Sequence, residues 1–195
     1  MRLLVVVAAG ALAAVSCGSV AQQQWKDPGF NQVVWVDTPN QNKRPPGTVV
    51  DTIVLHHTAG VSLWSTVSWF ATDKSQVSAH FCVGRDGSIV QFLSTYDRAW
   101  HAGVSLDAFG RKGVNDFSVG IEIVNKGDGT EEYPAAQLRA LDNLFAVLLR
   151  RFPTVKQITS HEFIAEPQGR KNDPIKFPWE RLKHFGVSLY FGLKR

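Results

Sequence analysis

Two almost continuously apolar segments, residues 48–56 and 118–124, constrain the fold of this chain more than any other feature. Both are rich in β-branched residues, which is typical of strands buried inside a sheet. Apolar residues recur at helical spacing in residues 62–72 and again in residues 134–152, where Pro134 opens the segment. Strands and helices that alternate in this way predict a sheet covered by helices.

Shorter segments complete the expected architecture. The Asp86-Gly87 pair predicts a hairpin turn between strands over residues 79–83 and 88–93. The remaining expected elements are strands over residues 33–36 and 157–160 and a short last helix over residues 179–185. A hairpin among strand–helix units makes the sheet mixed. The fold class that we predict is therefore α/β, a single domain with a central mixed β-sheet flanked by helices.

Length and composition agree with one folded domain. The chain has 195 residues, of which 44% are apolar and 19% are charged, and it has two cysteines. These values exclude a wholly disordered chain and a disulfide-dense scaffold. The net charge of +4 suggests an anionic partner, but no basic run exceeds two residues, so we do not expect nucleic acid to bind.

The first 21 residues predict a leader that is removed rather than folded. Arg2 is followed by an apolar run too short to span a bilayer, and the segment ends in the small residues that a leader peptidase reads. We therefore expect a signal peptide over residues 1–21, with cleavage before Gln22. The alternative is a lipoprotein leader over residues 1–16, after which Cys17 would carry a lipid. Either leader predicts an exported protein in the periplasm or cell envelope, such as an outer-membrane lipoprotein, or a secreted one.

The rest of the chain divides into an extension and a domain. Residues 22–47 contain several proline and glycine turns and are expected to form an N-terminal extension, followed by the domain over residues 48–195. Cleavage of the signal peptide would leave Cys82 as the one thiol. Its apolar neighbours indicate a buried core residue rather than a disulfide partner.

A few polar residues lie in or beside predicted buried strands, where a polar side chain is costly unless it has a partner. His56 ends a predicted strand, His161 follows another, and Glu122 interrupts an apolar one. Because side chains alternate along a strand, we expect only one of His56 and His57 to reach a site at the sheet edge. Two imidazoles and the carboxylate of Asp173 would suffice for a zinc ion with an open fourth position. The spacing matches no compact metal motif, so ordinary strand-end and loop residues remain the alternative.

Six short motifs occur in a fixed order between about residue 48 and residue 182. They are Val54–Ala59, Val77–Phe81, Arg85–Gly87, Arg98–Gly103, Asn115–Glu122 and Arg170–Pro174. In this order they resemble the zinc-dependent N-acetylmuramoyl-L-alanine amidases, a superfamily that includes peptidoglycan recognition proteins and phage amidase-type lysozymes. The sequence is most similar to the bacterial branch that cleaves anhydromuramyl peptides or intact cell wall.

The resemblance implies roles for five residues. His56, His161 and Asp173 would hold one catalytic Zn²⁺ ion. Glu122 would be the catalytic glutamate, and Lys171 would be the catalytic lysine that stabilises negative charge on the substrate. These roles agree with zinc chemistry in general, in which the metal activates water and a carboxylate moves its proton. Residues 48–195 would accordingly form a zinc amidase domain.

The resemblance also implies a substrate-binding cleft lined by Trp100, His101 and His57. For Trp100, a core aromatic and a sugar-stacking wall are both open. Two positions depart from the pattern of the family, because Phe163 stands where Asp is usual and Ile175 where Gly is typical. These departures leave the implied ligands in place and affect the rim of the cleft.

The function that follows is an exported peptidoglycan amidase, a zinc hydrolase that cuts the bond between N-acetylmuramic acid and L-alanine of the stem peptide. The alternative is a non-catalytic peptidoglycan-binding module on the same fold. The expected partner is peptidoglycan or soluble muropeptides, and membrane contact is expected only through a lipid on Cys17. Whether the substrate is polymeric wall or soluble 1,6-anhydro fragments is open at this point.

Overall fold

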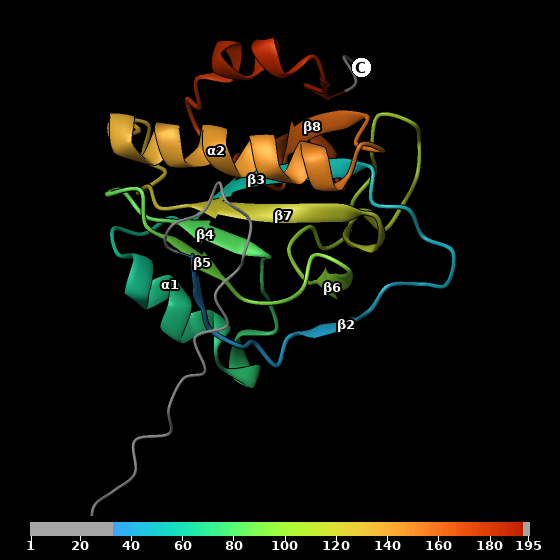
Figure 1. The fold of residues 1–195 in the computed structure, drawn as a ribbon, viewed down its shortest axis with the longest axis horizontal. Coiled ribbons are helices and arrows are strands. Elements are labelled where there is room, and N and C mark those ends of the chain that lie inside the picture. Colours follow the sequence, from blue (N-terminus) through green and yellow to red (C-terminus); the bar gives the residue numbers. More distant parts are fainter. Residues whose placement is uncertain (1–32, 193–195) are drawn as a thin grey trace, which may run out of the picture.

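The central sheet contains seven strands (Figure 1). In spatial order they are β1 (Val33–Trp35), β5 (Ile89–Gln91), β4 (Phe81–Val83), β7 (Ser118–Ile123), β3 (Thr52–His57), β8 (Gln157–Ser160) and β9 (Ser188–Leu189). Strands β4 and β5 are antiparallel and form the predicted hairpin, whereas all other neighbours in this sheet run parallel. The predicted mixed sheet is confirmed.

The computed structural model describes residues 33–192. The predicted signal peptide over residues 1–21, the cleavage site before Gln22 and the lipid on Cys17 lie outside the described residues. Within the described range, no helix combines the length and the apolar character needed to cross a bilayer.

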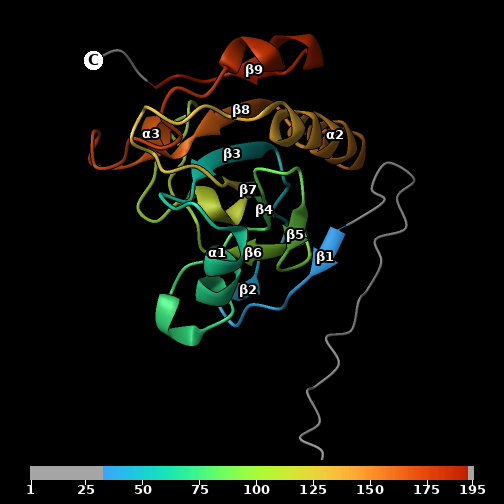
Figure 2. The ribbon, with the colours of Figure 1, turned by 90° about the vertical axis from the view of Figure 1, so that its left-hand side faces the viewer.

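Helices cover both faces of the sheet (Figures 1 and 2). Helix α2 (Ala135–Arg151) lies on one face, where it shares a core with the 3₁₀ helix η3 (Trp179–Phe185). Helix α1 (Leu63–Phe70) lies on the opposite face and begins at Ser62, whose hydroxyl accepts a hydrogen bond from Ser65 N–H. Shorter helices are η1 (Asp73–Ser75), η2 (Val114–Asp116) and α3 (His161–Ile164).

Side-chain alternation separates the core under α2 from the face that carries polar residues. Ile53 and Leu55 of β3 and Ile121 of β7 point into the core beneath α2, where all three are fully buried. His56 and Glu122 therefore point to the other face. The two strands are parallel and in register, with His56 paired to Glu122, so these two polar side chains lie next to each other.

The structure corrects two predicted elements. Strand β3 begins at Thr52 rather than at residue 48, because Thr48 N–H closes a turn onto the carbonyl of Pro45 and Val49 is 55% exposed. The predicted last helix has the expected bounds, but it is a 3₁₀ helix.

The described part of the N-terminal extension contributes two strands. Strand β1, which the sequence predicts, forms one edge of the central sheet beside β5. Strand β2 (Gln41–Lys43) pairs with β6 (Asp97–Ala99) in a separate two-stranded sheet, and neither of these strands is predicted. Residues 33–43 thus pack as part of the same unit as the residues that follow them.

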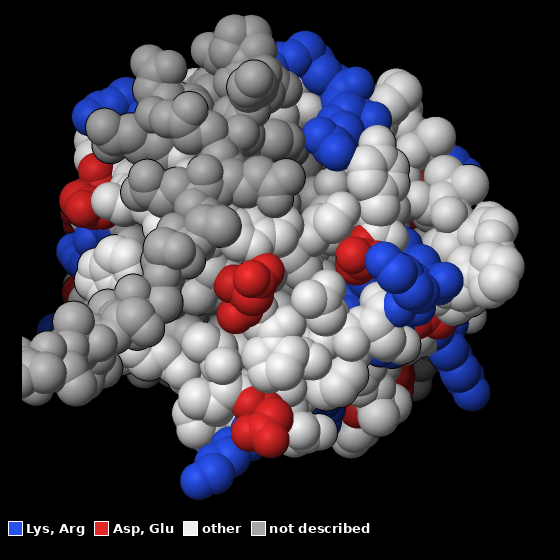
Figure 3. Space-filling view, turned by 60° about the horizontal axis from the view of Figure 1, so that its bottom comes forward, with Lys and Arg blue, Asp and Glu red and all other residues white. Residues whose placement is uncertain are grey.

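Two further sequence features can be compared with the structure. Cys82 is a free, fully buried thiol in the core beneath α1, as predicted. The charged side chains on the face shown in Figure 3 are interspersed in sign. On that face, the Lys and Arg side chains do not form a continuous basic stripe.

Candidate active and metal site

Three neighbouring strands bring the candidate residues together. His56 is the last residue but one of β3, and Glu122 has the corresponding position in β7. On the other side of β3, strand β8 ends at Ser160 and the next residue, His161, begins α3. The carboxyl ends of parallel strands meet at one edge of a sheet, which is where such folds commonly build their sites.

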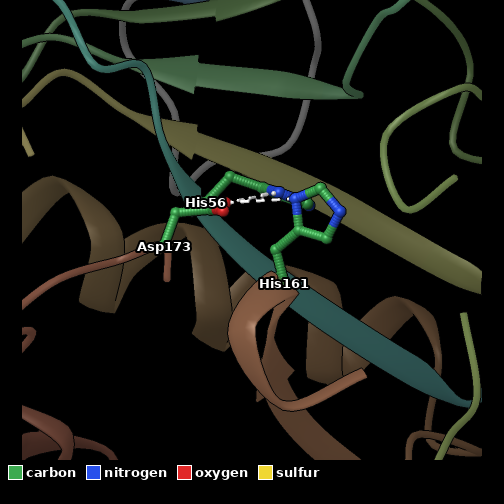
Figure 4. Close-up of side chains that lie close together, drawn as sticks. All are labelled: His56, His161 and Asp173. Atoms are coloured by element: carbon green, nitrogen blue, oxygen red, sulfur yellow. Dashed lines mark hydrogen bonds and ion pairs between the residues drawn. The ribbon is translucent and has the colours of Figure 1, made fainter. Parts of the chain in front are cut away.

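Asp173 completes a cluster with the two histidines (Figure 4). Its Oδ2 atom lies 3.1 Å from His56 Nδ1 and 3.2 Å from His161 Nδ1. One ligand atom from each residue lies within 4.8 Å of the others, and all three residues are buried. Nitrogen and carboxylate oxygen donors in this number suit zinc with one open position. The Nε2 atom of His161 is buried and has no hydrogen-bond partner among the described residues.

Burial and hydrogen bonding set the protonation states in this cluster. Burial lowers the pKa of His56 to about 4, with a further lowering by His161, although the neighbouring carboxylate of Asp173, which would accept a hydrogen bond from the protonated ring, opposes it. Burial alone would raise the pKa of Asp173, but its short contacts with the rings of His161 and His56 outweigh burial and hold that pKa well below its usual range. At neutral pH, His56 is therefore neutral and Asp173 is ionised, which are the forms that bind a metal ion.

All eight predicted site residues line one cavity of about 470 Å³. They are His56, His57, Trp100, His101, Glu122, His161, Lys171 and Asp173. They come from four of the six motifs and from His161, which follows β8, so their convergence is a property of the fold. The cavity thus brings the candidate metal cluster, a carboxylate and a cation together in one open cleft.

Glu122 carries an unpartnered carboxylate oxygen in this cavity. Part of the side chain is accessible from the cavity, but its Oε2 atom is buried and has no hydrogen-bond partner among the described residues. Burial raises the pKa of Glu122 to about 8, Asp173 adds to the rise, and Lys171 opposes it. A carboxyl with a pKa near neutrality can both accept and return a proton, as a general acid and base must.

His57 corrects the expectation that only one of the paired histidines reaches the site. Alternation does separate them, because His56 belongs to the metal cluster and His57 does not. Both nevertheless line the cavity, since His57 is the last residue of β3 and its half-buried ring lies at the rim. There, His57 Nδ1 accepts a hydrogen bond from Ile175 N–H, and the ring packs so closely on Gly127 that a Cβ there would lie 2.2 Å from His57 Nε2.

Trp100 forms a wall of the cavity and is half-buried. Its indole Nε1 donates a 2.7 Å hydrogen bond to Asn42 Oδ1, which also accepts from Arg98. Asn42 belongs to β2, so the extension helps to fix this wall. The sequence offers no signal for this contact, because β2 is short and polar and gives no strand pattern.

Lys171 is exposed and lines the cavity from the loop that precedes Asp173. The adjacent Arg170 ties this loop to its surroundings through hydrogen bonds from Nε to the carbonyl of Glu166 and from Nη2 to that of Val104. The loop that carries Lys171 is therefore anchored, and the exposed side chain of Lys171 can approach a molecule bound in the cavity.

The raised pKa of Glu122 predicts how the stability of the metal-free protein depends on pH. A carboxyl whose pKa is higher in the folded state stabilises the fold at low pH, and this contribution is lost as the pH rises through the folded pKa of about 8. Glu122→Gln removes the effect. We expect the metal-free variant to gain up to about 1.4 kcal/mol per pH unit relative to the metal-free wild type above pH 6, and the gain to level off above the folded pKa, at a total of about 3 kcal/mol by pH 9. Thermal unfolding of both proteins across this range tests it, and a constant difference would contradict the buried position of the carboxylate.

Comparison with known proteins agrees with this geometry. Residues 45–176 match a protein family described as N-acetylmuramoyl-L-alanine amidase. The 1,6-anhydro-N-acetylmuramyl-L-alanine amidase AmpD of Citrobacter freundii is 44% identical over 110 residues, which are 55% of this chain and 56% of that protein. The match thus spans little more than half the length of this curated relative.

Solved structures match over more of the chain. The crystal structure of a selenomethionine derivative of AmpD has a TM-score of 0.71 and 31% identity, and the match covers 85% of this chain and 100% of that one. The amidase AmiD from Escherichia coli, in complex with the substrate anhydro-N-acetylmuramic acid-L-Ala-D-gamma-Glu-L-Lys, has a TM-score of 0.61 and 29% identity. That match covers 75% of this chain and 62% of AmiD.

Proposed function

This chain belongs to the N-acetylmuramoyl-L-alanine amidase family, in its bacterial anhydromuramyl-peptide branch, and from this membership we propose that it hydrolyses muropeptides. The bond cleaved is the amide between N-acetylmuramic acid and the L-alanine of the stem peptide. The observation that carries the proposal is the cavity in which the His56, His161 and Asp173 cluster lies beside the unpartnered carboxylate of Glu122.

We propose that the cluster holds one zinc ion. His56, His161 and Asp173 would be its ligands, and their chemistry fits because two imidazoles, of which His56 is neutral, and an ionised carboxylate converge there. When bound, zinc supplies an activated water and a Lewis acid at neutral pH. The remaining steps fall to side chains of the protein.

Glu122 would carry the proton. Its carboxylate accepts the proton of the attacking water and then gives it to the nitrogen of the leaving L-alanine, so that the amine departs neutral. The pKa of about 8 suits both transfers, because the same group must be ionised before the attack and protonated after it. Among the described residues no donor engages the buried Oε2 atom, so the carboxylate is not committed to a structural hydrogen bond there.

Lys171 would stabilise the oxyanion that develops on the scissile carbonyl. Lys171→Ala is expected to lower kcat by about 10²-fold, the usual cost of removing one group that stabilises charge in the transition state, and to leave zinc content unchanged. Steady-state kinetics with elemental analysis of the same sample measures both. Lys183→Ala, at an exposed lysine paired with Glu180, is the matched control. An unchanged kcat in Lys171→Ala would remove this residue from the mechanism.

The proposed activity is tested by mass spectrometry of the products. The purified protein is incubated with soluble anhydromuropeptides and, separately, with intact sacculi, each with and without a chelator. We expect the soluble substrate to yield an intact stem peptide and the free sugar, with no product in the chelator arm. Binding without any product would support the non-catalytic binding module instead.

We also propose that the protein is exported. The support is the sequence of residues 1–21, with one basic residue, an apolar run and small residues at the end. Expression in a bacterial host followed by fractionation and analysis of the mature N-terminus tests this proposal. A chain that begins at Gln22 would indicate signal-peptide cleavage, and one that begins at a lipidated Cys17 would indicate a lipoprotein. An unprocessed chain in the cytoplasm would contradict export.

A further inference from the structure

A chain of buried hydrogen bonds runs from the backbone to one of the proposed zinc ligands. Ser118 Oγ lies 2.6 Å from the carbonyl oxygen of Val114 and 3.0 Å from His101 Nε2. The other ring nitrogen of His101, Nδ1, lies 3.0 Å from His56 Nε2. All four residues are buried, and His101 is 8% exposed.

The hydroxyl of Ser118 fixes the direction of these hydrogen bonds. A carbonyl can only accept, so the single hydroxyl proton of Ser118 points to Val114. Ser118 Oγ must then accept from His101 Nε2, which therefore carries a proton. Both ring nitrogens of His101 face uncharged groups, a hydroxyl and an imidazole, and this buried ring is therefore neutral. A neutral imidazole has one N–H, so His101 Nδ1 is an acceptor.

The acceptor on His101 determines which nitrogen of His56 is available. His56 Nε2 must donate its proton to His101 Nδ1, and this leaves a bare lone pair on His56 Nδ1. That lone pair faces Asp173 Oδ2 at 3.1 Å. Two acceptors at this distance repel each other unless a cation lies between them. The chain of hydrogen bonds therefore favours a metal ion over a shared proton.

The position of the His101 ring is built into the neighbouring strand. A Cβ atom on Gly120 of β7 would lie 2.5 Å from His101 Cγ, so the ring occupies the space that the missing side chain leaves. The backbone N–H of His101 is held by Asn115 Oδ1 at 3.0 Å. The backbone of His101 is thus anchored by Asn115, and its ring packs directly against the backbone of β7 at Gly120.

We propose that His101, oriented by Ser118, is a positioning residue that holds His56 with Nδ1 directed at the metal position. This inference rests on the proposed zinc site and deepens it. It gives His101 a role through His56 rather than through contact with the substrate. Outer partners of metal ligands typically contribute about 10- to 100-fold to metal affinity.

Two variants of His101 separate this role from a general effect on folding. His101→Phe keeps a ring but removes the acceptor, and we expect zinc affinity to fall by about 10- to 100-fold. His101→Asn places its Oδ1 atom near the former Nδ1, and we expect it to recover most of that loss. Zinc affinity is measured by competition with a chromogenic chelator. His184→Phe, at an exposed histidine of η3, is the control and should bind zinc as the wild type does.

A second measurement uses the wild-type protein and does not depend on any variant folding. In the zinc-loaded protein, ¹⁵N NMR should show His101 protonated at Nε2 and bare at Nδ1. A proton on Nδ1 would overturn the inference, as would wild-type zinc affinity in folded His101→Phe, and in both cases the amidase proposal would stand. If the wild type itself binds no zinc, the proposed zinc site fails instead.

Discussion

Glu122→Gln is expected to lower kcat for an anhydromuropeptide by about 10³-fold while zinc stays bound. Glutamine preserves the size and shape of the side chain, but its amide cannot accept a proton from water and return it to the leaving amine. Glu122 is not one of the three residues whose ligand atoms converge on the metal position, so the ion should be retained. The variant thereby separates proton transfer from metal binding.

Kinetics and elemental analysis on one preparation check this expectation. The matched control is Glu180→Gln, at an exposed glutamate of η3 that pairs with Lys183, and its kcat should equal that of the wild type. A Glu122→Gln protein with full activity would remove Glu122 as the acid and base. A variant without zinc would show instead that the carboxylate supports the metal site.

The position of Glu122 explains why a lone carboxylate in an apolar strand indicates a functional site in this sequence. A single carboxylate between Ile121 and Ile123 is costly in a buried strand unless function or a partner accounts for it. The structure provides no hydrogen-bond partner for Oε2 among the described residues, and Glu122 lines the cavity. The unfavourable burial is consistent with a functional site rather than with a structural ion pair.

The main elements of the fold were predictable because they are long or strongly patterned. Helix α2 shows a continuous apolar stripe, strand β7 is almost wholly apolar, and the turn at Asp86-Gly87 fixes the hairpin of β4 and β5. Strands β2 and β6 were not predictable, since each has three residues and a polar sequence. Their pairing depends on the tertiary fold rather than on local preference.

The candidate site was predictable at the level of residues but not at the level of contacts. His56, Glu122 and His161 stood out because each lies in or next to a predicted strand, and the resemblance to the amidase family assigned their roles. The contacts of Ser118 with His101 and of Asn42 with Trp100 join residues far apart in the sequence. The first depends on the space left by Gly120 and the second on the pairing of β2 with β6, neither of which a sequence pattern encodes.

Asp173→Ala is expected to abolish both zinc binding and amidase activity. Asp173 supplies the one carboxylate oxygen of the three-residue cluster, and its Oδ2 atom lies within 3.2 Å of both histidine nitrogens. Its removal leaves two imidazoles, which hold zinc more weakly than three ligands do. We expect the loss of affinity to exceed the roughly 100-fold upper value for an outer partner such as His101.

Thermal unfolding tests the loss of zinc binding without measuring activity. Zinc binds only the folded cluster, so an excess of free zinc about 1,000-fold above Kd should stabilise the wild type by about 4 kcal/mol, and a chelator should remove this gain. Neither zinc nor the chelator should shift the melting temperature of Asp173→Ala. Asp128→Ala, at an exposed aspartate outside the cluster, should respond to zinc as the wild type does. If zinc stabilised Asp173→Ala as much as the wild type, the ion would be bound elsewhere, and the cluster of His56, His161 and Asp173 would not be the metal site.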